Sequence, residues 1–334
     1  MTIQRVLVAP LNYSHRQEGQ YQAFRDVFGA AAVHEFDYMH YVRQDKAPDQ
    51  KLVSAVKDFS PDWIWFQLQN SEAIQADTLL EIRRRWPRCL ITHWMGDCRP
   101  QIAPYLASIC RQAHGTLISS VGQIPLYQAA GAPHVAYCQI GLDPAADVDG
   151  MPPWDPSFRV PAVVFCGDHY GHVSDFKKGT EQRVATILAL VRAGLDVGVI
   201  GRGWPTEIPT AGQCHVKQQH HVCKRAKVIV AINHFNDIDR YYSDRLLISM
   251  ASGTPVVTWR VPGLEHEFTD RHDLVCASSE SEFVDQVKWL LVNPDQAVTI
   301  GRSGRNKVVR EHTWTARLRQ ILPTIESWHK ELCA

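Results

Sequence analysis

Gly141-Leu-Asp-Pro-Ala-Ala-Asp-Val-Asp-Gly-Met-Pro-Pro-Trp-Asp-Pro156 separates the sequence into two similar halves. Four Pro, two Gly and four Asp within these residues are incompatible with a helix or a central strand. We therefore place a linker at 141–156, which predicts one domain at 1–150 and a second at 157–334. A chain of 334 residues is long enough for two domains of about 150 residues each.

Short apolar runs alternate with helical stretches on the N-terminal side of this linker. Such alternation is typical of a parallel sheet, because parallel neighbours need a crossover connection. The expected strands lie at 5–11, 33–38, 62–68, 90–95, 115–120 and 135–140. The expected helices lie at 19–28, 73–86 and 124–130.

The same pattern resumes on the C-terminal side. Its expected strands lie at 162–166, 196–200, 228–233, 255–259 and 274–277. Its expected helices lie at 179–193, 220–226, 244–252, 280–291 and 294–311. A last helix from about residue 315 is expected to cross back to the first domain. The sequence thus predicts an α/β protein with two Rossmann-like doubly wound sheets facing across a cleft, where ligands bind at the carboxyl ends of the strands.

The composition narrows the classes of function. The chain has 35 Lys plus Arg and 35 Asp plus Glu, so no overall charge favours nucleic acid or an anionic membrane. No stretch approaches the about 20 apolar residues of a membrane span, and the first eleven residues lack the features of a signal peptide. The nine Cys are scattered and form no CxxC pair, which favours reduced thiols and a cytoplasmic location.

The strongest local signal is Tyr242-Ser-Asp-Arg-Leu-Leu-Ile-Ser-Met-Ala-Ser-Gly-Thr-Pro-Val-Val257. Asp244 or the residue before it begins a helix, and Arg245 lies in the first turn. Free backbone N–H groups and a guanidinium at a helix start suit a diphosphate. The alternative is an ordinary capped helix with Arg245 paired to a nearby acid.

A second signal follows the first strand of the second domain, in Phe165-Cys-Gly-Asp-His-Tyr-Gly-His-Val-Ser-Asp-Phe-Lys-Lys-Gly-Thr180. Gly167 allows a ligand to approach the backbone, and Lys178 offers a charge for phosphate; Asp168 lies between them. The segment is neither a Walker loop nor a GxGxxG fingerprint, so a flexible surface loop is the alternative.

Two candidate catalytic residues lie in the first domain. Asp97 follows the fourth strand and is a candidate general base or acceptor-binding group, although it could also cap a helix or pair with Arg99. His15 lies in the loop after the first strand and is a candidate acceptor contact, with a solvated loop histidine as the alternative.

Two further clusters favour simpler readings. Cys214, His215, His220, His221 and Cys223 lack a second ligand pair at zinc spacing, so we expect no metal. The basic run at 83–88 ends a helix, where cations are favoured by the dipole. Its alternative reading is a phosphate-contacting patch for a DNA acceptor.

Several stretches resemble the CgeB-like glycosyltransferases, relatives of the large retaining GT-B group. The clearest lie in the second half, and together they span most of the chain. They are Asn233-His-Phe-Asn-Asp-Ile-Asp-Arg-Tyr-Tyr-Ser-Asp-Arg245, Met250-Ala-Ser-Gly-Thr-Pro-Val-Val257, Val261-Pro-Gly-Leu-Glu-His-Glu-Phe268, Gly301-Arg-Ser-Gly-Arg-Asn-Lys-Val-Val-Arg-Glu-His-Thr-Trp314, Val199-Ile-Gly-Arg-Gly-Trp204 and Trp94-Met-Gly-Asp97.

The resemblance implies donor-binding roles for the second domain. The donor would lie along Gly167–Lys178 and along Gly201 and Arg202. Its diphosphate would bind at Asp244 and Arg245, and its phosphate and sugar would approach Gly263, Leu264 and Glu265. Two positions depart from the family pattern: Ile248 stands where these enzymes usually carry the Glu that holds the donor ribose, and Arg240 stands at the first Glu of the related pair.

These observations predict a glycosyltransferase that moves a sugar from a nucleotide-diphosphate sugar, a UDP-sugar first, to an unidentified hydroxyl. The resemblance implies retention of configuration and no cofactor beyond the co-substrate. The acceptor could be a saccharide, a protein or a hydroxymethylated DNA base, and the oligomeric state is open. Two alternatives are a nucleotide-sugar 2-epimerase and a non-catalytic GT-B-like binding protein, the latter favoured by Ile248. A dinucleotide oxidoreductase is disfavoured, because no glycine fingerprint follows the first strand.

Overall fold

The computed structural model describes residues 2–13, 16–69, 71–143 and 160–334. These residues form two compact units, which are described separately. The first unit comprises Met1–Gly141 and Trp314–Ala334, and the second comprises Leu142–Thr313. Most of the predicted linker at 141–156 lies outside the described residues.

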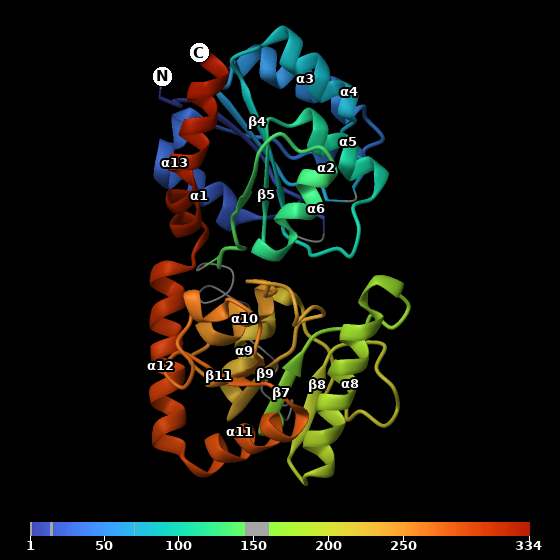
Figure 1. The fold of residues 1–334 in the computed structure, drawn as a ribbon, viewed down its shortest axis with the longest axis vertical. Helices are drawn as coiled ribbons and strands as arrows, with labels where there is room; N and C mark the ends of the chain where they lie inside the picture. Colours follow the sequence, from blue (N-terminus) through green and yellow to red (C-terminus); the bar gives the residue numbers. More distant parts are fainter. Residues whose placement is uncertain (1, 14–15, 70, 144–159) are drawn as a thin grey trace. The chain divides into compact units, whose positions relative to one another are not determined.

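The first unit contains a six-stranded sheet in the order β2-β1-β3-β4-β5-β6 (Figure 1). All five neighbouring pairs are parallel. The strands are β1 (Val6–Ala9), β2 (Val33–Glu35), β3 (Trp63–Phe66), β4 (Leu90–Met95), β5 (Gly115–Ile118) and β6 (Val135–Tyr137). The helices are α1 (Glu18–Phe28), α2 (Tyr38–Arg43), α3 (Pro48–Phe59), α4 (Ala76–Arg85), α5 (Pro104–Gln112), α6 (Ile124–Ala129) and α13 (Trp314–Cys333).

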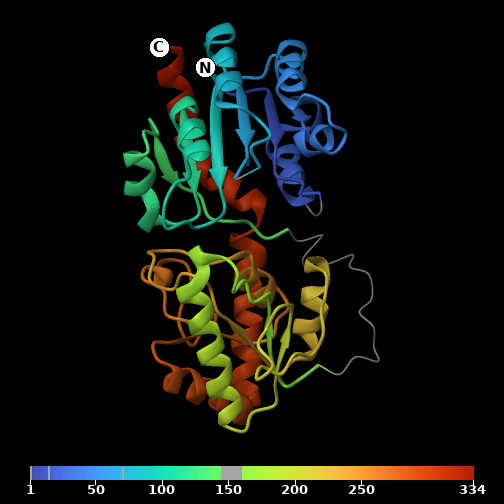
Figure 2. The same cartoon turned by 90° about the vertical axis from the view of Figure 1, so that its right-hand side faces the viewer.

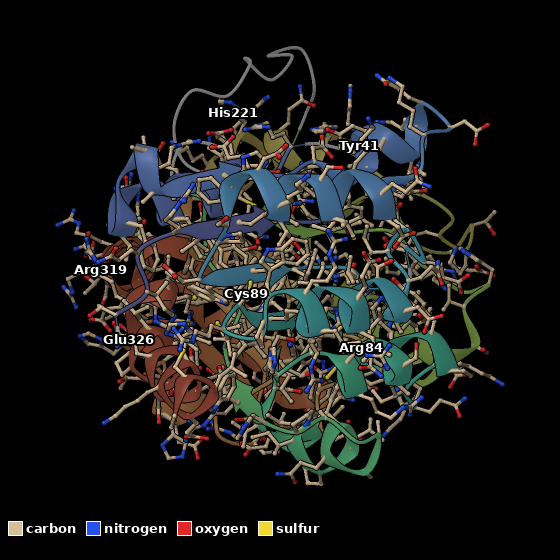
Figure 3. All side chains as sticks on the ribbon, turned by 90° about the horizontal axis from the view of Figure 1, so that it is seen from above. Tyr41, Arg84, Cys89, His221, Arg319 and Glu326 are labelled. Atoms are coloured by element: carbon tan, nitrogen blue, oxygen red, sulfur yellow. The ribbon has the colours of Figure 1, made fainter. Side chains whose placement is uncertain are left out.

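Alternating side chains send the two faces of this sheet into different cores. Val6 and Val8 of β1 pack with α1 and with the apolar side of α13, whereas Leu7 and Ala9 pack with α3 and α4. Figure 1 shows α13, in red, beside α1. The other side of α13 is polar, and Arg319 projects outward from it (Figure 3).

The second unit contains a five-stranded parallel sheet in the order β11-β10-β9-β7-β8. The strands are β7 (Val163–Cys166), β8 (Val197–Ile200), β9 (Val228–Ala231), β10 (Val256–Trp259) and β11 (Val275–Ala277). The helices are α8 (Lys177–Arg192), α9 (Gln219–Arg225), α10 (Asp244–Ala251), α11 (Glu280–Val292) and α12 (Pro294–Glu311). The long α8, in yellow-green, is seen most clearly in the turned view (Figure 2).

The prediction of two parallel-sheet α/β domains is confirmed, and most strands lie within two or three residues of their expected ends. Several expected strands are too long, and the cause is clear for one of them. The strand predicted at 33–38 ends at Glu35, because the Asp37 side chain accepts a hydrogen bond from the backbone N–H of His40 and begins α2. The sequence analysis also missed α3 and α5, each of which has a proline in its first turn. No helix in the described part of the chain has the length and apolarity to cross a membrane.

Candidate functional site

The loops that follow β7 and β8 approach each other closely in the second unit. A side chain on Gly201 would overlap the backbone carbonyl of Gly167, so this contact requires glycine. The two loops are also joined by Asp168 and Arg202. The Asp168 carboxylate accepts from the Arg202 backbone N–H at 2.8 Å and from its guanidinium at 2.9 Å. The structure therefore brings four of the predicted donor-binding residues together.

The start of α10 lies beside the same loops. A β-carbon on Gly167 would come within 3.4 Å of the Cδ atom of Arg245. Asn233 fixes this helix start, because its Oδ1 accepts from the backbone N–H of Ser243 at 3.0 Å. The Asp244 carboxylate accepts from the backbone N–H of Arg245 at 2.8 Å. Within the described ranges, the Arg245 guanidinium meets no carboxylate, so the alternative of a pairing to a nearby acid is not seen.

Two residues at this edge of the sheet were not among the predicted site residues. Arg183 of α8 is 0% exposed, and its Nε donates to the carbonyl oxygen of Ile232 at 2.9 Å. Its Nη1 lies 2.7 Å from Nε2 of His234, which follows β9. Arginine can only donate, so His234 accepts through Nε2 and carries its proton on Nδ1. The spacing of Gly179, Arg183 and Ile187 on one buried helical face was the signal that could have pointed to Arg183.

Arg183, Arg245 and His234 lie close to one another at this edge, and no carboxylate among the described residues pairs with either arginine. Burial, and then the charges of Arg183, Arg245 and His169, lower the pKa of His234 to about 2, so its imidazole is neutral at neutral pH. Burial, and then the charge of Arg245, lower the pKa of Arg183 well below its ordinary value. Both shifts measure how poorly this place accommodates uncompensated positive charge. An anion is the ligand that such an arrangement favours.

The remaining predicted donor residues lie in different surroundings. Lys178 pairs with Asp237 at 2.5 Å, and its side chain is 85% exposed. Gly263 packs against Asp239 and Arg240, where a β-carbon would overlap the Asp239 carboxylate. Leu264 is buried in the core of the unit, whereas Glu265 is exposed.

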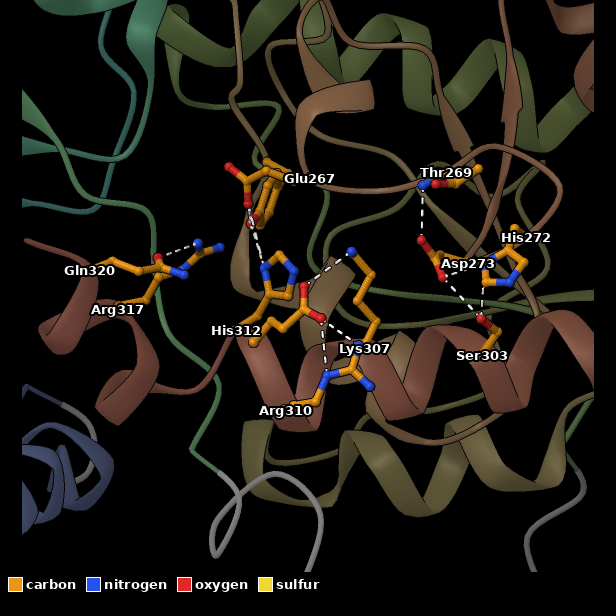
Figure 4. A network of polar contacts seen from close by, with 12 residues as sticks. Glu267, Thr269, His272, Asp273, Ser303, Lys307, Arg310, His312, Arg317 and Gln320 are labelled. Atoms are coloured by element: carbon orange, nitrogen blue, oxygen red, sulfur yellow. Dashed lines mark hydrogen bonds and ion pairs between the residues drawn. The ribbon is translucent and has the colours of Figure 1, made fainter.

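A polar network links Tyr242, two residues before α10, to Glu267, two residues after the 263–265 loop. The Tyr242 hydroxyl donates to Oε2 of Glu267 at 2.6 Å, and the same oxygen lies 3.4 Å from Nδ1 of the buried His312. Figure 4 shows Glu267 and His312 together with a second group on α12, in which Ser303 donates to Asp273. Glu267 therefore ties the segment that follows the 263–265 loop both to the segment before α10 and to His312.

In the first unit, Asp97 lies two residues beyond β4 and pairs with Arg99 at 3.0 Å. It does not cap α5, which begins only at Pro104. His15, the second candidate, lies outside the described residues. Of the basic run that ends α4, Arg84 is exposed, and Figure 3 shows its side chain at the surface. This exposure fits a solvated helix end and a phosphate-contacting surface patch equally well.

The residues that the structure describes contain no group of three or more His, Cys, Asp or Glu placed to hold a metal ion. His220 and His221 contact each other through their rings, with centroids 4.0 Å apart. The thiols of Cys214 and Cys223 hydrogen-bond to that of Cys166, and these bonds and burial raise its pKa.

The chain is similar to known proteins in two respects: part of its sequence matches a family model, and its fold matches solved structures. Residues 182–323 match the family model described as glycosyl transferase-like. No curated protein matches the chain in sequence. Anabaena Alr3699/HepE, solved in complex with UDP, has a TM-score of 0.62 at 12% identity, with 97% of this chain and 100% of that chain covered.

Two other solved structures share the fold. Sucrose-phosphate synthase from Thermosynechococcus elongatus has a TM-score of 0.61 at 13% identity, over 98% of this chain and 100% of that chain. A putative UDP-N-acetylglucosamine 2-epimerase from Listeria monocytogenes has a TM-score of 0.52 at 10% identity, over 99% and 98%. The chain therefore has the two-domain fold of the GT-B glycosyltransferases, and its residues 182–323 match the glycosyl transferase-like family model.

Proposed function

We propose that this protein is a glycosyltransferase that moves a sugar from a nucleotide-diphosphate sugar to an acceptor hydroxyl. The observation that carries the proposal is the cationic start of α10. There Arg245 lies beside Gly167 and, among the described residues, meets no carboxylate. Negative charge develops on the leaving phosphate as the glycosidic bond breaks, and a helix start with a guanidinium stabilises that charge.

A UDP-sugar is the first donor to test. HepE of Anabaena, which shares the fold, has been solved with UDP and with UDP-glucose. We assign the donor to the second unit, at Gly167, Asp168, Lys178, Gly201, Arg202, Asp244, Arg245, Gly263, Leu264 and Glu265. The resemblance of the second half to CgeB-like enzymes supports that subgroup and retention of configuration. The nine cysteines are all free thiols, which suits action in a reducing cytoplasm.

We assign the acceptor to the first unit, with Asp97 beside it. Asp97→Asn keeps the size of the side chain and removes its charge. If the enzyme inverts and the carboxylate is the general base, the transfer rate falls about 10²–10⁴-fold; if it retains, Asp97 binds the acceptor and the KM for the acceptor rises. The Asp97 side chain is 45% exposed and that of Arg99 is 18% exposed, so a melting curve of the variant is needed to separate a loss of stability from a loss of chemistry. An unchanged rate excludes Asp97 from the chemistry.

A thermal-shift screen with UDP, GDP, ADP, CMP and their sugar conjugates tests the donor site first. A ligand at 100 times its dissociation constant stabilises the folded protein by about 2.7 kcal/mol. We expect a shift with one nucleotide family, and that family then decides which radiolabelled sugar is used to find the acceptor. No shift with any of these nucleotides contradicts the proposal.

One observation favours a second candidate, a protein that binds the nucleotide sugar without transferring it. Ile248, which replaces the usual ribose-binding Glu, is 3% exposed and packs in the apolar core of the second unit. No carboxylate is therefore offered at this position. Binding of UDP-glucose without any release of UDP, with or without candidate acceptors, supports this second candidate.

A further inference from the structure

Arg183 is a buried cation whose charge no acid balances. Its guanidinium contacts the carbonyl oxygen of Ile232, the imidazole of His234 and, at 5.4 Å, the ring of Phe165. In the described part of the chain it has no ion pair, and its Nη2 has no hydrogen-bond partner. Burial of a guanidinium of this kind is strongly unfavourable unless an anion accompanies it.

His234 adds a second donor in the same place. Its Nε2 accepts from Arg183, so its Nδ1 carries the proton, and this Nδ1 also has no partner among the described residues. The side chain is 8% exposed, so it is sealed from solvent almost as fully as Arg183. The two groups are bonded to each other; Nη2 of Arg183, with two N–H groups, and Nδ1 of His234, with one, have no acceptor among the described residues.

The backbone also holds the two elements of the pair together. The first turn of α8 packs against His234, which lies three residues after β9, because a β-carbon on Gly179 would overlap the carbonyl group of His234. The charge of Arg245 also lies close enough to lower the pKa of both Arg183 and His234.

We propose that Arg183 and His234 bind a phosphoryl group, with Nη2 of Arg183 and Nδ1 of His234 donating to its oxygens. A phosphoryl group supplies several acceptor oxygens and the negative charge that both side chains lack. The assignment of this group to the diphosphate of a nucleotide sugar rests on the proposed function. Inorganic phosphate or pyrophosphate would be held by the same contacts.

Two aromatic side chains cover the pair in this structure. Phe176 stacks on the His234 ring at 4.3 Å between centroids, and Tyr170 meets the ring edge-on at 5.5 Å. Tyr170 is the exposed one of the two and has a backbone φ of 57°, which is unfavourable for a bulky residue. A phosphoryl group that reaches the pair therefore has to displace Tyr170, which lies between the His234 ring and solvent.

The test measures the affinity of the full-length protein for pyrophosphate by titration calorimetry. Arg183→Met is expected to weaken binding about 10- to 100-fold, and Arg183→Lys to weaken it less, because an ammonium keeps the charge but not the planar fork. Arg192→Met, on the exposed end of the same helix, removes the same charge and is expected to bind pyrophosphate like the wild type. Arg183→Lys keeps the measurement possible if Arg183→Met does not fold.

Equal pyrophosphate affinity in the wild type and in the Arg183 variants overturns the inference, and buried water then satisfies the two N–H groups. A second titration with UDP and uridine separates this inference from the proposed function. If the wild type binds UDP and the Arg183 variants bind it equally well, the donor site stands without this pair. If pyrophosphate binding depends on Arg183 but no nucleotide binds, the phosphoryl site stands and the proposed function fails.

Discussion

The two sheets carry different polar side chains at the carboxyl ends of their strands. After β1 and β3 of the first unit, neutral groups satisfy one another: Gln67 accepts from the Gln20 side chain at 2.8 Å, and Asn12 donates to the Tyr21 hydroxyl at 3.0 Å. After β7 and β9 of the second unit, Arg183 and Arg245 meet no acid in the part of the chain that is described.

The difference distinguishes the two units by the charge of the side chains at their strand ends. Both units have the same parallel α/β architecture, so the fold alone does not assign their roles. Cations that remain unbalanced at the strand ends do assign one of them. The predictions below test whether this contrast is real.

The largest expected effect concerns a buried base in the first unit that is not at the strand ends. His93 lies within β4, and burial lowers its pKa from 6.5 to about 4. The unfolded chain therefore takes up the proton first as the pH falls. The contribution to stability is complete above about pH 6.5 and is lost towards pH 4, by about 1.4 kcal/mol per pH unit and about 3 kcal/mol in total.

Urea unfolding between pH 7.5 and 4.5 checks this expectation. His93→Leu is expected to flatten the dependence of the unfolding free energy on pH, because it removes one of the buried histidines that resist protonation. Identical slopes for His93→Leu and the wild type contradict it. His93 is an uncharged side chain without a hydrogen-bond partner among the described residues, and inside the core it marks no site. The result distinguishes it from Arg183, the charged side chain with an unpaired Nη2 at the strand ends of the second unit.

The next prediction concerns the close backbone contact between Gly179 and His234 in the second unit. Gly179→Ala is expected to lower the unfolding free energy by about 2–3 kcal/mol, because the added methyl group overlaps the His234 carbonyl. Gly194→Ala is the matched control: no atom lies within 4 Å of its added methyl group, and only a φ of 76° opposes it, at about 1 kcal/mol. Thermal melts that rank the two variants in the opposite order rule out this close contact.

A third effect concerns binding. Arg245→Ala is expected to weaken binding of a nucleoside diphosphate by about 1.5–3 kcal/mol, which is typical of a charge-assisted contact. Arg202→Ala is the comparison, because that guanidinium is already paired with Asp168 at 2.9 Å and is expected to contribute less. Calorimetric titration with UDP measures both. An unchanged affinity for the Arg245 variant removes this residue from the site.

The smallest effect belongs to the neutral edge of the first unit. Asn12→Ala removes the partner of the Tyr21 hydroxyl and of the Gln17 backbone N–H, and is expected to cost about 1–2 kcal/mol of stability. Affinity for UDP is expected to stay the same, since the donor is assigned to the other unit. An Asn12→Ala variant that loses UDP affinity but keeps its stability contradicts the assignment of the donor to the second unit alone.

The fold could be predicted from the sequence because it depends on local patterns. Buried strands such as Leu90–Met95 are short apolar runs, and Pro294 and Glu311 bound α12 as expected. The short α2 was missed because the apolar run at 33–38 favours a strand. Its start depends on a single capping hydrogen bond, which Asp37 accepts from the backbone N–H of His40.

The candidate site was less accessible to sequence reasoning. The helix start at Arg245 could be predicted from a motif, whereas Arg183 lies in the second turn of a helix that is otherwise ordinary. Its importance comes from His234, 51 positions further along the chain, and from the absence of an acid around it in the described residues. Pairings of this kind arise only when the chain folds.

The path of the chain through the two units also has a consequence for biosynthesis. The first unit is made of two segments, and α13 supplies Leu318, Ile321 and Ile325 to the core beneath β1 and β3. The second unit is one continuous segment. A ribosome therefore synthesises all of the second unit before it makes the helix that completes the first. Until then, the sheet face that carries Trp63 and Trp65 lacks the part of its core that α13 supplies.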